Sequence, residues 1–186
     1  MFNVVYKSLL FLVLSIAVAG CARTTTMGHK VALPETPIKQ MNWVYKSGQF
    51  NAQNKSAQKD INDTLNELST LLQKRLPAVF ALNGIEVTTD NAASQYELFI
   101  APFHATYSSY AGGKVNLDMR AQLYDKAQGS KLIWWGDIHF FDPNPHMGTL
   151  EKASDKFAKS VLEQLASDGV IRLESGEVKM PEEKAK

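Results

Sequence analysis

The sequence predicts an α+β domain in which two helices pack on one face of a mainly antiparallel sheet of three to five strands. Three observations predict this fold. Two segments carry apolar residues at helical spacing, several segments alternate apolar and polar residues, and a chain of 186 residues suits one domain. The elements are expected within residues 40–173, in the order strand, helix, three or four strands, helix. The second face of the sheet is then solvated or available to a partner.

Two helices are expected because their apolar residues recur every three or four positions and so share one face. The first begins near Ser56 and the second near Leu150, with Thr149 as its N-cap. Pro77 should end or kink the first helix, because proline has no backbone N–H to donate. The apolar faces comprise Ile61, Leu65, Leu68, Leu72 and Leu76 in the first helix, and Leu150, Ala153, Phe157, Val161 and Leu165 in the second.

The strands are read from alternation and from turn residues. Residues 115–124 alternate most cleanly, and the Gly-containing turn that follows predicts an antiparallel hairpin with residues 131–141. Pro102 should mark a bulge or an edge within the preceding strand. Residues 40–45 form either a first strand, with Met41, Trp43 and Tyr45 on one face, or an extended segment packed by Trp43. The other expected strands are residues 84–89, 96–107 and, as a short addition, 170–173.

Charge is balanced, with 20 Lys and Arg residues against 19 Asp and Glu residues. A nucleic-acid-binding domain usually carries a basic patch, and the sequence has no basic run, so nucleic acid is not an expected partner. The chain has one cysteine, Cys21, which cannot form an internal disulfide.

The N-terminus has the order of a secretory signal peptide. Lys7 precedes an apolar run from Leu9 to Val18, and the small residues Ala19 and Gly20 follow. The run is shorter than the ~20 apolar residues that a transmembrane helix needs. We therefore expect residues 1–20 to be a cleaved signal peptide, with a buried N-terminal helix as the alternative.

The junction Val18-Ala19-Gly20-Cys21 resembles the lipobox of bacterial lipoproteins. The resemblance implies cleavage between Gly20 and Cys21, a diacylglyceryl group on the Cys21 thiol and an acylated amine, with palmitate among the acyl chains. Ala22 and Arg23 replace the aspartate that favours inner-membrane retention, which implies the periplasmic side of the outer membrane. Residues 21–39 are then a lipidated N-terminus with a tether, residues 40–173 the domain, and residues 174–186 a charged flexible tail.

The search for catalytic chemistry gives no complete site. Asp137, His139, Asp142 and His146 are close in sequence, but zinc needs three or four donors that converge on one point, so a solvated loop is favoured over a metal site. No serine lies in a nucleophile-elbow pattern. We therefore expect no catalytic residues, no metal and no cofactor. A hydrolase using His104 or His139 is an alternative.

Aromatic residues give a clearer indication of function. In the strand 131–141, Leu132, Trp134, Ile138 and Phe140 should share one side and Ile133, Trp135 and Phe141 the other. Either both faces are covered, or Trp135 and its neighbours form an exposed patch of the kind that marks interaction sites. The candidate binding surface comprises Trp135, Ile133, Phe141 and Tyr124.

The layout resembles that of small envelope lipoproteins. It combines the lipobox, a tether, a helix, an antiparallel meander containing residues 131–137 and a closing helix. The lipopolysaccharide-assembly lipoprotein, the penicillin-binding-protein activators and several uncharacterised lipoprotein families have this general layout. The resemblance implies a non-catalytic binding or assembly role in the cell envelope, with the membrane and an envelope protein or glycolipid as partners. A purely structural lipoprotein is a further alternative.

Overall fold

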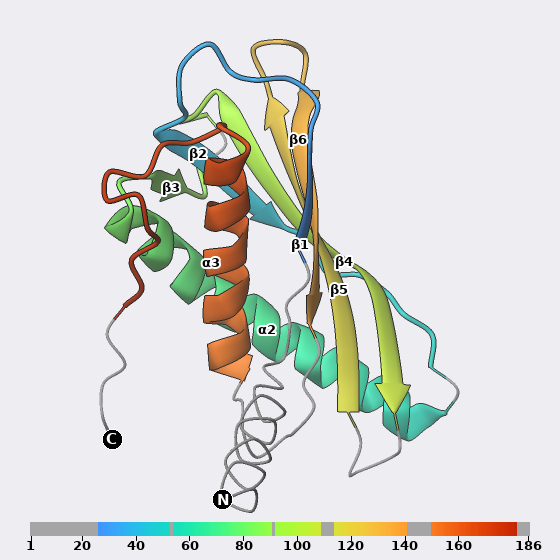
Figure 1. Cartoon of the computed structure of the whole chain (residues 1–186). Coiled ribbons are helices and arrows are strands. Elements are labelled where there is room, and N and C mark those ends of the chain that lie inside the picture. The colour runs from blue at the N-terminus through green and yellow to red at the C-terminus, as the bar shows by residue number, and fades with distance from the viewer. Residues whose placement is uncertain (1–25, 53, 91, 109–113, 141–149, 182–186) are drawn as a thin grey trace, which may run out of the picture.

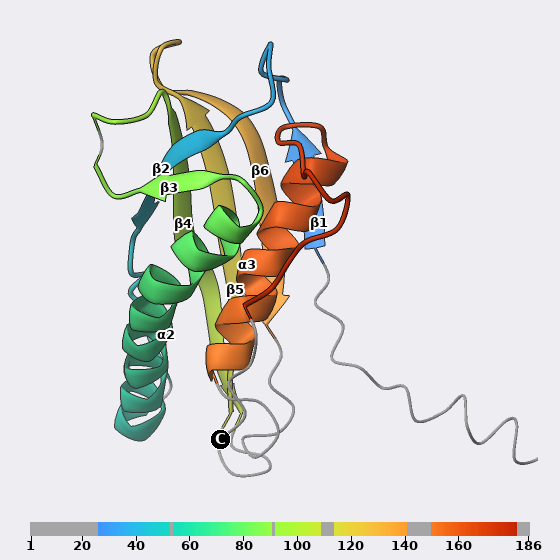
Figure 2. The same ribbon diagram turned by 90° about the vertical axis from the view of Figure 1, so that its left-hand side faces the viewer.

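The computed structural model describes residues 26–52, 54–90, 92–108, 114–140 and 150–181. Within them, a six-stranded sheet carries two helices on one face (Figures 1 and 2). The helices are α2 (Lys55–Leu82) and α3 (Leu150–Ser167). The strands are β1 (Thr26–Lys30), β2 (Gln40–Tyr45), β3 (Glu86–Thr88), β4 (Tyr96–Ser108), β5 (Lys114–Asp125) and β6 (Lys131–Phe140).

The sheet corrects the predicted fold class, because it is mixed and has six strands rather than three to five mainly antiparallel ones. Its order is β1-β6-β5-β4-β2-β3, and β2 pairs in parallel with both β3 and β4. The parallel pairs arise because α2 carries the chain from the end of β2 back to the start of β3, as a crossover must. The broader α+β class holds.

The helix α2 buries the face that the periodicity predicts. Its buried residues include all five of that face: Ile61, Leu65, Leu68, Leu72 and Leu76. The Asn54 side chain caps the helix by accepting a hydrogen bond from the Ala57 backbone N–H at 2.9 Å. Pro77 lies inside the helix and does not end it. Val79 and Phe80, which follow it, are fully buried, and this burial offsets the hydrogen bond that proline cannot make.

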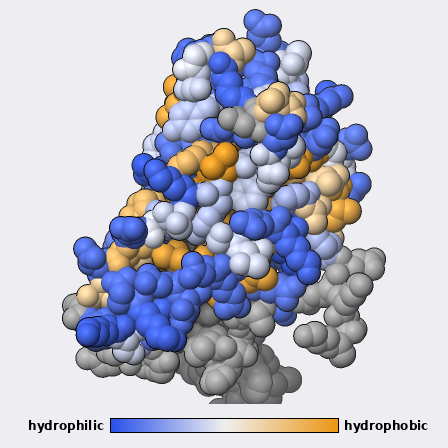
Figure 3. All heavy atoms as spheres, turned by 180° about the vertical axis from the view of Figure 1, so that it is seen from behind, coloured by the Kyte–Doolittle hydropathy of each residue, from blue (hydrophilic) through white to orange (hydrophobic). Residues whose placement is uncertain are grey.

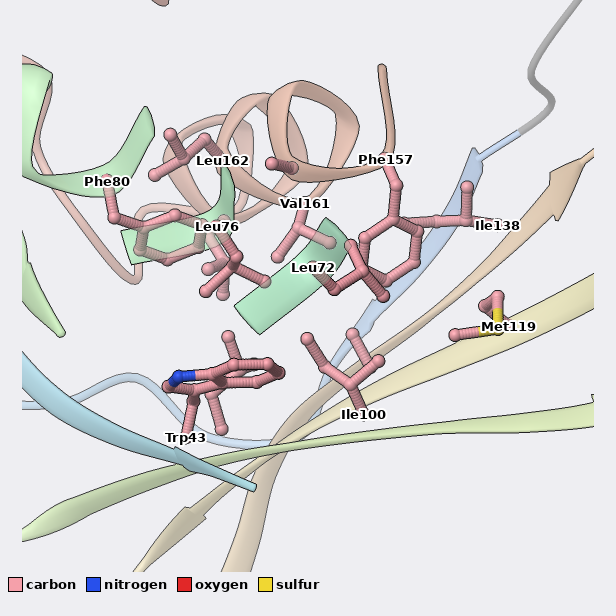
Figure 4. Packing of buried hydrophobic residues seen from close by; sticks show 14 of the residues in the cluster. Trp43, Leu72, Leu76, Phe80, Ile100, Met119, Ile138, Phe157, Val161 and Leu162 are labelled. Carbon is pink, nitrogen blue, oxygen red and sulfur yellow. The ribbon is translucent and has the colours of Figure 1, made fainter. Parts of the chain in front are cut away.

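The core lies between the helices and the sheet, and side chains from both layers converge there (Figure 4). The predicted strand 40–45 is confirmed, with Met41 and Trp43 buried. The antiparallel hairpin of β5 and β6 is confirmed, as is a bulge in β4 next to Pro102. A second irregularity, beside Tyr124 in the pairing of β5 with β6, was not expected.

Two segments outside the predicted helices and strands are also held by the domain. Residues 26–30, expected within the tether, form β1 and pair antiparallel with β6. There α3 approaches so closely that a Cβ at position 28 would lie 2.4 Å from Gln164 Cγ. This close approach explains why position 28 is a glycine. In the C-terminal segment, the Asn83 side chain accepts a hydrogen bond from the Lys179 N–H and donates one to its carbonyl. Val170 and Ile171 are buried without forming a strand.

Tyr45 gives the fold a predicted sensitivity to alkaline pH. Its hydroxyl is enclosed with no hydrogen-bond partner among the described residues, and burial raises its pKa from 10.0 to about 12. The fold therefore favours the protonated form. The resulting stabilisation is complete below pH 10 and is lost as the pH rises towards 12.

Phenylalanine cannot ionise, so the Tyr45→Phe variant should lose less stability than the wild type as the pH rises through this interval. We expect the two losses in the free energy of unfolding to differ by about 1–2 kcal/mol, a value that allows for the partial solvent contact of Tyr45. Urea denaturation at pH 9 and pH 11.5 measures the difference. Equal losses in the two proteins would contradict this account of Tyr45.

Candidate binding surface on the uncovered sheet face

The sheet face opposite the helices, called the outer face below, is built by the alternation of β5. Leu117, Met119, Ala121 and Leu123 point into the core, where each is at most 3% exposed. The intervening side chains must lie on the outer face, since successive residues of a strand point to opposite sides. All of them are half-buried: Asn116, Asp118, Arg120, Gln122 and Tyr124.

Arg120 is the centre of this face. Its guanidinium lies between two aromatic rings, 4.9 Å from the centroid of Phe103 and 4.8 Å from that of Trp135. Its Nε and Nη2 atoms also donate to the two carboxylate oxygens of Asp137, at 2.6 and 2.8 Å. The hydrogen bond to Asp137 raises the pKa of Arg120, so the guanidinium remains charged. We call these four residues the Arg120 clamp.

The sequence left open whether Trp135 is covered or exposed, and the structure shows an intermediate state. It is half-buried, and its outer-face neighbours are polar side chains rather than a covering layer of structure. Its ring stacks on that of His29, with centroids 4.1 Å apart and planes inclined by 20°. The pairing of β1 with β6 sets His29 opposite Trp135 and so positions this contact.

The other members of the predicted surface have different fates. The prediction that Ile133 belongs to the binding surface is wrong, because its side chain is 3% exposed and belongs to the core beside Trp134. Between β5 and β6, Leu123 pairs with Trp134 and Tyr124 with Leu132, which leaves Ile133 as the extra residue of a bulge. The bulge turns Ile133 inward and places Leu132 on the outer face with Tyr124. Phe141, Gly20 and Cys21 lie outside the described residues.

Two histidines share one carboxylate beside the clamp. Asp118 contacts His104 Nδ1 at 2.9 Å through one oxygen and His139 Nδ1 through the other. The imidazoles come from β4 and β6, and Asp118 lies between them on β5. Both are substantially exposed, with side-chain fractions of 58% for His104 and 44% for His139.

The His104–Asp118–His139 group can bind polar partners. Of the three groups of a catalytic triad, it supplies the carboxylate and the imidazole. A carboxylate at Nδ1 orients an imidazole, whereas acyl transfer also needs a nucleophile at Nε2. In the described part of the chain, the hydrogen bonds place a carboxylate and no hydroxyl beside these rings. Neither this group nor any other set of three or more His, Cys, Asp or Glu side chains among the described residues is arranged so that it could hold a metal ion. Asp142 and His146 lie outside them, and Asp137 is engaged by Arg120.

A hollow of about 1040 Å³ lies away from the outer face. It is lined by the segment before β2, by the start of β4 and by the segment after α3, and it includes Lys39, Tyr96, Arg172 and Glu174. Burial is the main reason that the pKa of Tyr96 is raised. The lining carries both signs of charge and contains none of the predicted site residues.

Sequence reasoning placed Trp135 and Tyr124 in the candidate surface. It missed Arg120 and His29, which contact Trp135, and Phe103 and Asp118, which lie on the same face. The alternation of β5 places Asp118 and Arg120 on one face with Tyr124, and this signal was present in the sequence. The partners on β1 and β4 depend on strand order and on the β4 bulge, which no local pattern specifies.

None of the described helices has the length and apolar character needed to cross a bilayer. No protein-family model matches the sequence, and no curated protein does.

Solved structures to which the chain is similar include a PelC dodecamer from Paraburkholderia phytofirmans, with 11% identity, a TM-score of 0.43 and coverage of 76% of this chain and 97% of that one. A minor lipoprotein from Acinetobacter baumannii has 16% identity, a TM-score of 0.33 and coverage of 72% and 96%. A DUF4136 family protein from Bacteroides thetaiotaomicron has 6% identity, a TM-score of 0.39 and coverage of 84% and 98%. The neighbours thus include a lipoprotein.

Proposed function

We propose that this protein is a lipid-anchored, non-catalytic component of the bacterial cell envelope that binds an envelope protein through its outer face. The observation that carries the binding proposal is the Arg120 clamp on a sheet face that neither helix covers. The anchor is proposed from the lipobox-like residues Val18 to Cys21 after an apolar run, with the periplasmic side of the outer membrane as its location.

The clamp has the composition and the order of an interface anchor. Arginine, tryptophan and tyrosine are the residues that most often dominate binding energy at protein interfaces. Asp137 and the two aromatic rings already hold Arg120 in one place, so a partner that contacts it loses little side-chain entropy on binding. The exposed faces of Phe103 and His104 extend the same surface with an apolar and a polar group.

The exposed apolar residues of the domain are dispersed, which favours a polar protein interface over a hydrophobic one. Figure 3, which views the molecule from behind, shows hydrophobic residues scattered among hydrophilic ones. On the outer face, Val44 and Phe103 are exposed by 37% and 47% and are accompanied by charged groups. An interface of this kind is expected to depend strongly on a few anchors, of which Arg120 is the most central.

The anchor is tested with Cys21→Ala. In the wild type we expect a mature chain that begins at Cys21 and takes up an alkyne-palmitate label. The variant should keep residues 1–20 and take up no label, because signal peptidase II requires the lipidated cysteine. Intact-mass spectrometry and labelling of membrane fractions measure both effects. A wild-type chain with an unmodified Cys21 and an intact leader would refute the proposed anchor.

The binding surface is tested by photocrosslinking in intact cells. A photoreactive phenylalanine derivative replaces Phe103 on the outer face or, as the control, Leu82 at the end of α2; each of these residues is 47% exposed. We expect a defined adduct from position 103 only, lost in Arg120→Ala. That substitution should cost the fold only about 1 kcal/mol, because the ion pair is partly solvated.

Three outcomes would contradict the proposal. One is the same adducts from both positions, and another is a position-103 adduct that survives Arg120→Ala in a folded protein. The mass of the adduct also distinguishes the expected protein from a glycolipid, and a glycolipid adduct would overturn the choice of partner.

A further inference from the structure

The start of β1 lies at the same end of the sheet as a projecting arm formed by β4 and β5. Thr26 pairs with Ile138 of β6, which pairs with Met119 of β5, which in turn pairs with Pro102 of β4. This row crosses the sheet where β1 begins. Beyond it, β6 continues for two residues, to Phe140, whereas β4 and β5 continue farther, as far as Ser108 and Lys114. We call residues 104–108 and 114–118 the arm.

The arm is as long as the chain that would connect the domain to its lipid. From Met119 to Lys114 it extends about 17 Å beyond the row, at roughly 3.3 Å per residue. Four residues separate Cys21 from Thr26 in the sequence. Even when fully extended, the five Cα–Cα steps between those two residues span at most roughly 18 Å.

The direction of β1 means that the connection to Cys21 starts at the same end of the sheet as the arm. Because β1 runs antiparallel to β6, the chain enters the sheet at the end where the arm projects and then runs towards the opposite end (Figure 1). An extended connection along the arm places Cys21 level with the end of the arm, and a shorter one places the bilayer nearer the domain.

We infer that the end of the domain formed by the arm and the start of α2 rests on the headgroups of the bilayer that holds the Cys21 lipid. This inference rests on the proposed lipid anchor. The opposite end, where Ala127 lies in the turn between β5 and β6, then points away from the membrane. Along β5, Asp125 at that end lies about 20 Å from Met119 and in the direction opposite to the arm. It is therefore beyond the roughly 18 Å that the connection from Thr26 to Cys21 can span.

The chemistry of this end suits headgroups rather than hydrocarbon. The start of α2 lies beside the arm, since Asn54, Ala57 and Tyr107 line a common hollow of about 240 Å³. Hydrophilic residues gather over the part of the molecule where α2 begins (Figure 3). Lys59 and Asp63 form an exposed ion pair there, Thr106 is exposed, and Tyr107 is half-buried. Tyrosine beside charged and polar groups is typical of the membrane–water interface.

The test measures the distance of each end from the lipid headgroups. The full-length acylated protein is placed in vesicles of phosphatidylethanolamine and phosphatidylglycerol that contain a headgroup spin label. A fluorophore is attached through a genetically encoded reactive residue at Thr106 or, as the control, at Ala127; both sites are exposed. A third protein carries the Thr106 label and a 20-residue Gly-Ser spacer between Ala22 and Arg23, which adds about 25 Å of flexible reach.

We expect quenching at Thr106 to be severalfold stronger than at Ala127 and to fall severalfold when the spacer is present. Equal quenching at the two sites, or stronger quenching at Ala127, would overturn the orientation. Strong quenching at Thr106 that the spacer leaves unchanged would show that the connection does not impose the contact, and would also overturn the orientation.

Mass spectrometry of the same sample separates the proposed anchor from the proposed orientation. An unmodified Cys21 would overturn the anchor and the orientation together, whereas an acylated Cys21 with equal quenching would overturn the orientation alone.

Discussion

Trp134→Ala is expected to lower the free energy of unfolding by about 3–5 kcal/mol, because it truncates the largest fully buried side chain in the described part of the chain. The indole Nε1 of Trp134 donates to Asp168 Oδ2 at 2.7 Å. The substitution opens a cavity under α3. It also leaves the Asp168 carboxylate with one fewer donor, since Gln164 Nε2 at 3.1 Å remains its side-chain partner. Urea denaturation followed by circular dichroism measures the loss.

Trp135→Ala is the matched control, because it removes the same side chain one residue further along β6. Trp135 is only half-buried and loses the His29 stack and the Arg120 contact, so the expected cost is about 1–2 kcal/mol. Trp134→Phe, which keeps an aromatic ring but removes the donor to Asp168, should fall between the two. A cost for Trp135→Ala as large as that for Trp134→Ala would contradict the assignment of the two rings to opposite faces.

Leu72→Ala is expected to cost about 2–5 kcal/mol. Leu72 is fully buried in the layer between the helices and the sheet, and Figure 4 shows its side chain beside those of Phe157 and Val161 from α3. Removal of the isobutyl group therefore leaves a cavity at the contact between α2 and α3. Denaturation of the purified domain measures the change.

Leu71→Ala provides the comparison on the adjacent helical position. Leu71 is half-buried, and alanine has a higher helix propensity than leucine, so the expected loss is about 1 kcal/mol or less. If the two substitutions destabilised the domain equally, α2 would not be oriented as the structure has it.

The sequence was sufficient for α2 because the information lies within one segment. Its leucines repeat at helical spacing, and the repeat by itself determines which side of the helix is apolar. The hairpin of β5 and β6 was predictable for the same reason, since two alternating segments flank a short turn with Gly129 at a φ of +71°.

Features that depend on contacts distant in sequence were not predictable. Residues 26–30 contain Gly28 and His29 and lack an apolar alternation, so only the pairing with β6 makes them a strand. The parallel pairing of β2 follows from the path of α2, which local periodicity does not reveal. At Ile133, the expected alternation fails because one extra residue in β6 shifts the register.

The candidate surface was predictable only in part for the same physical reason. An aromatic residue in a strand pattern draws attention to Trp135, and its exposure then depends on what the neighbouring strands bring to it. Arg120 and His29 contact Trp135, and Phe103 contacts Arg120, only after the three strands that carry them are assembled into the sheet. The charge pair of Arg120 with Asp137 is set by their direct opposition in the register of β5 and β6.

The position of β1 has a consequence for the order in which the sheet can assemble. β1 is the first of the described strands to be synthesised, yet its sole partner in the described sheet is β6, the last of them in sequence. Until β6 has been synthesised, the backbone amides and carbonyls of β1 have no partner strand with which to form hydrogen bonds, and contacts between such distant segments form slowly. The first described strand thus lies at the edge of the sheet that closes last, and until β6 joins it β1 is an unpaired strand, which is the kind of segment that aggregates.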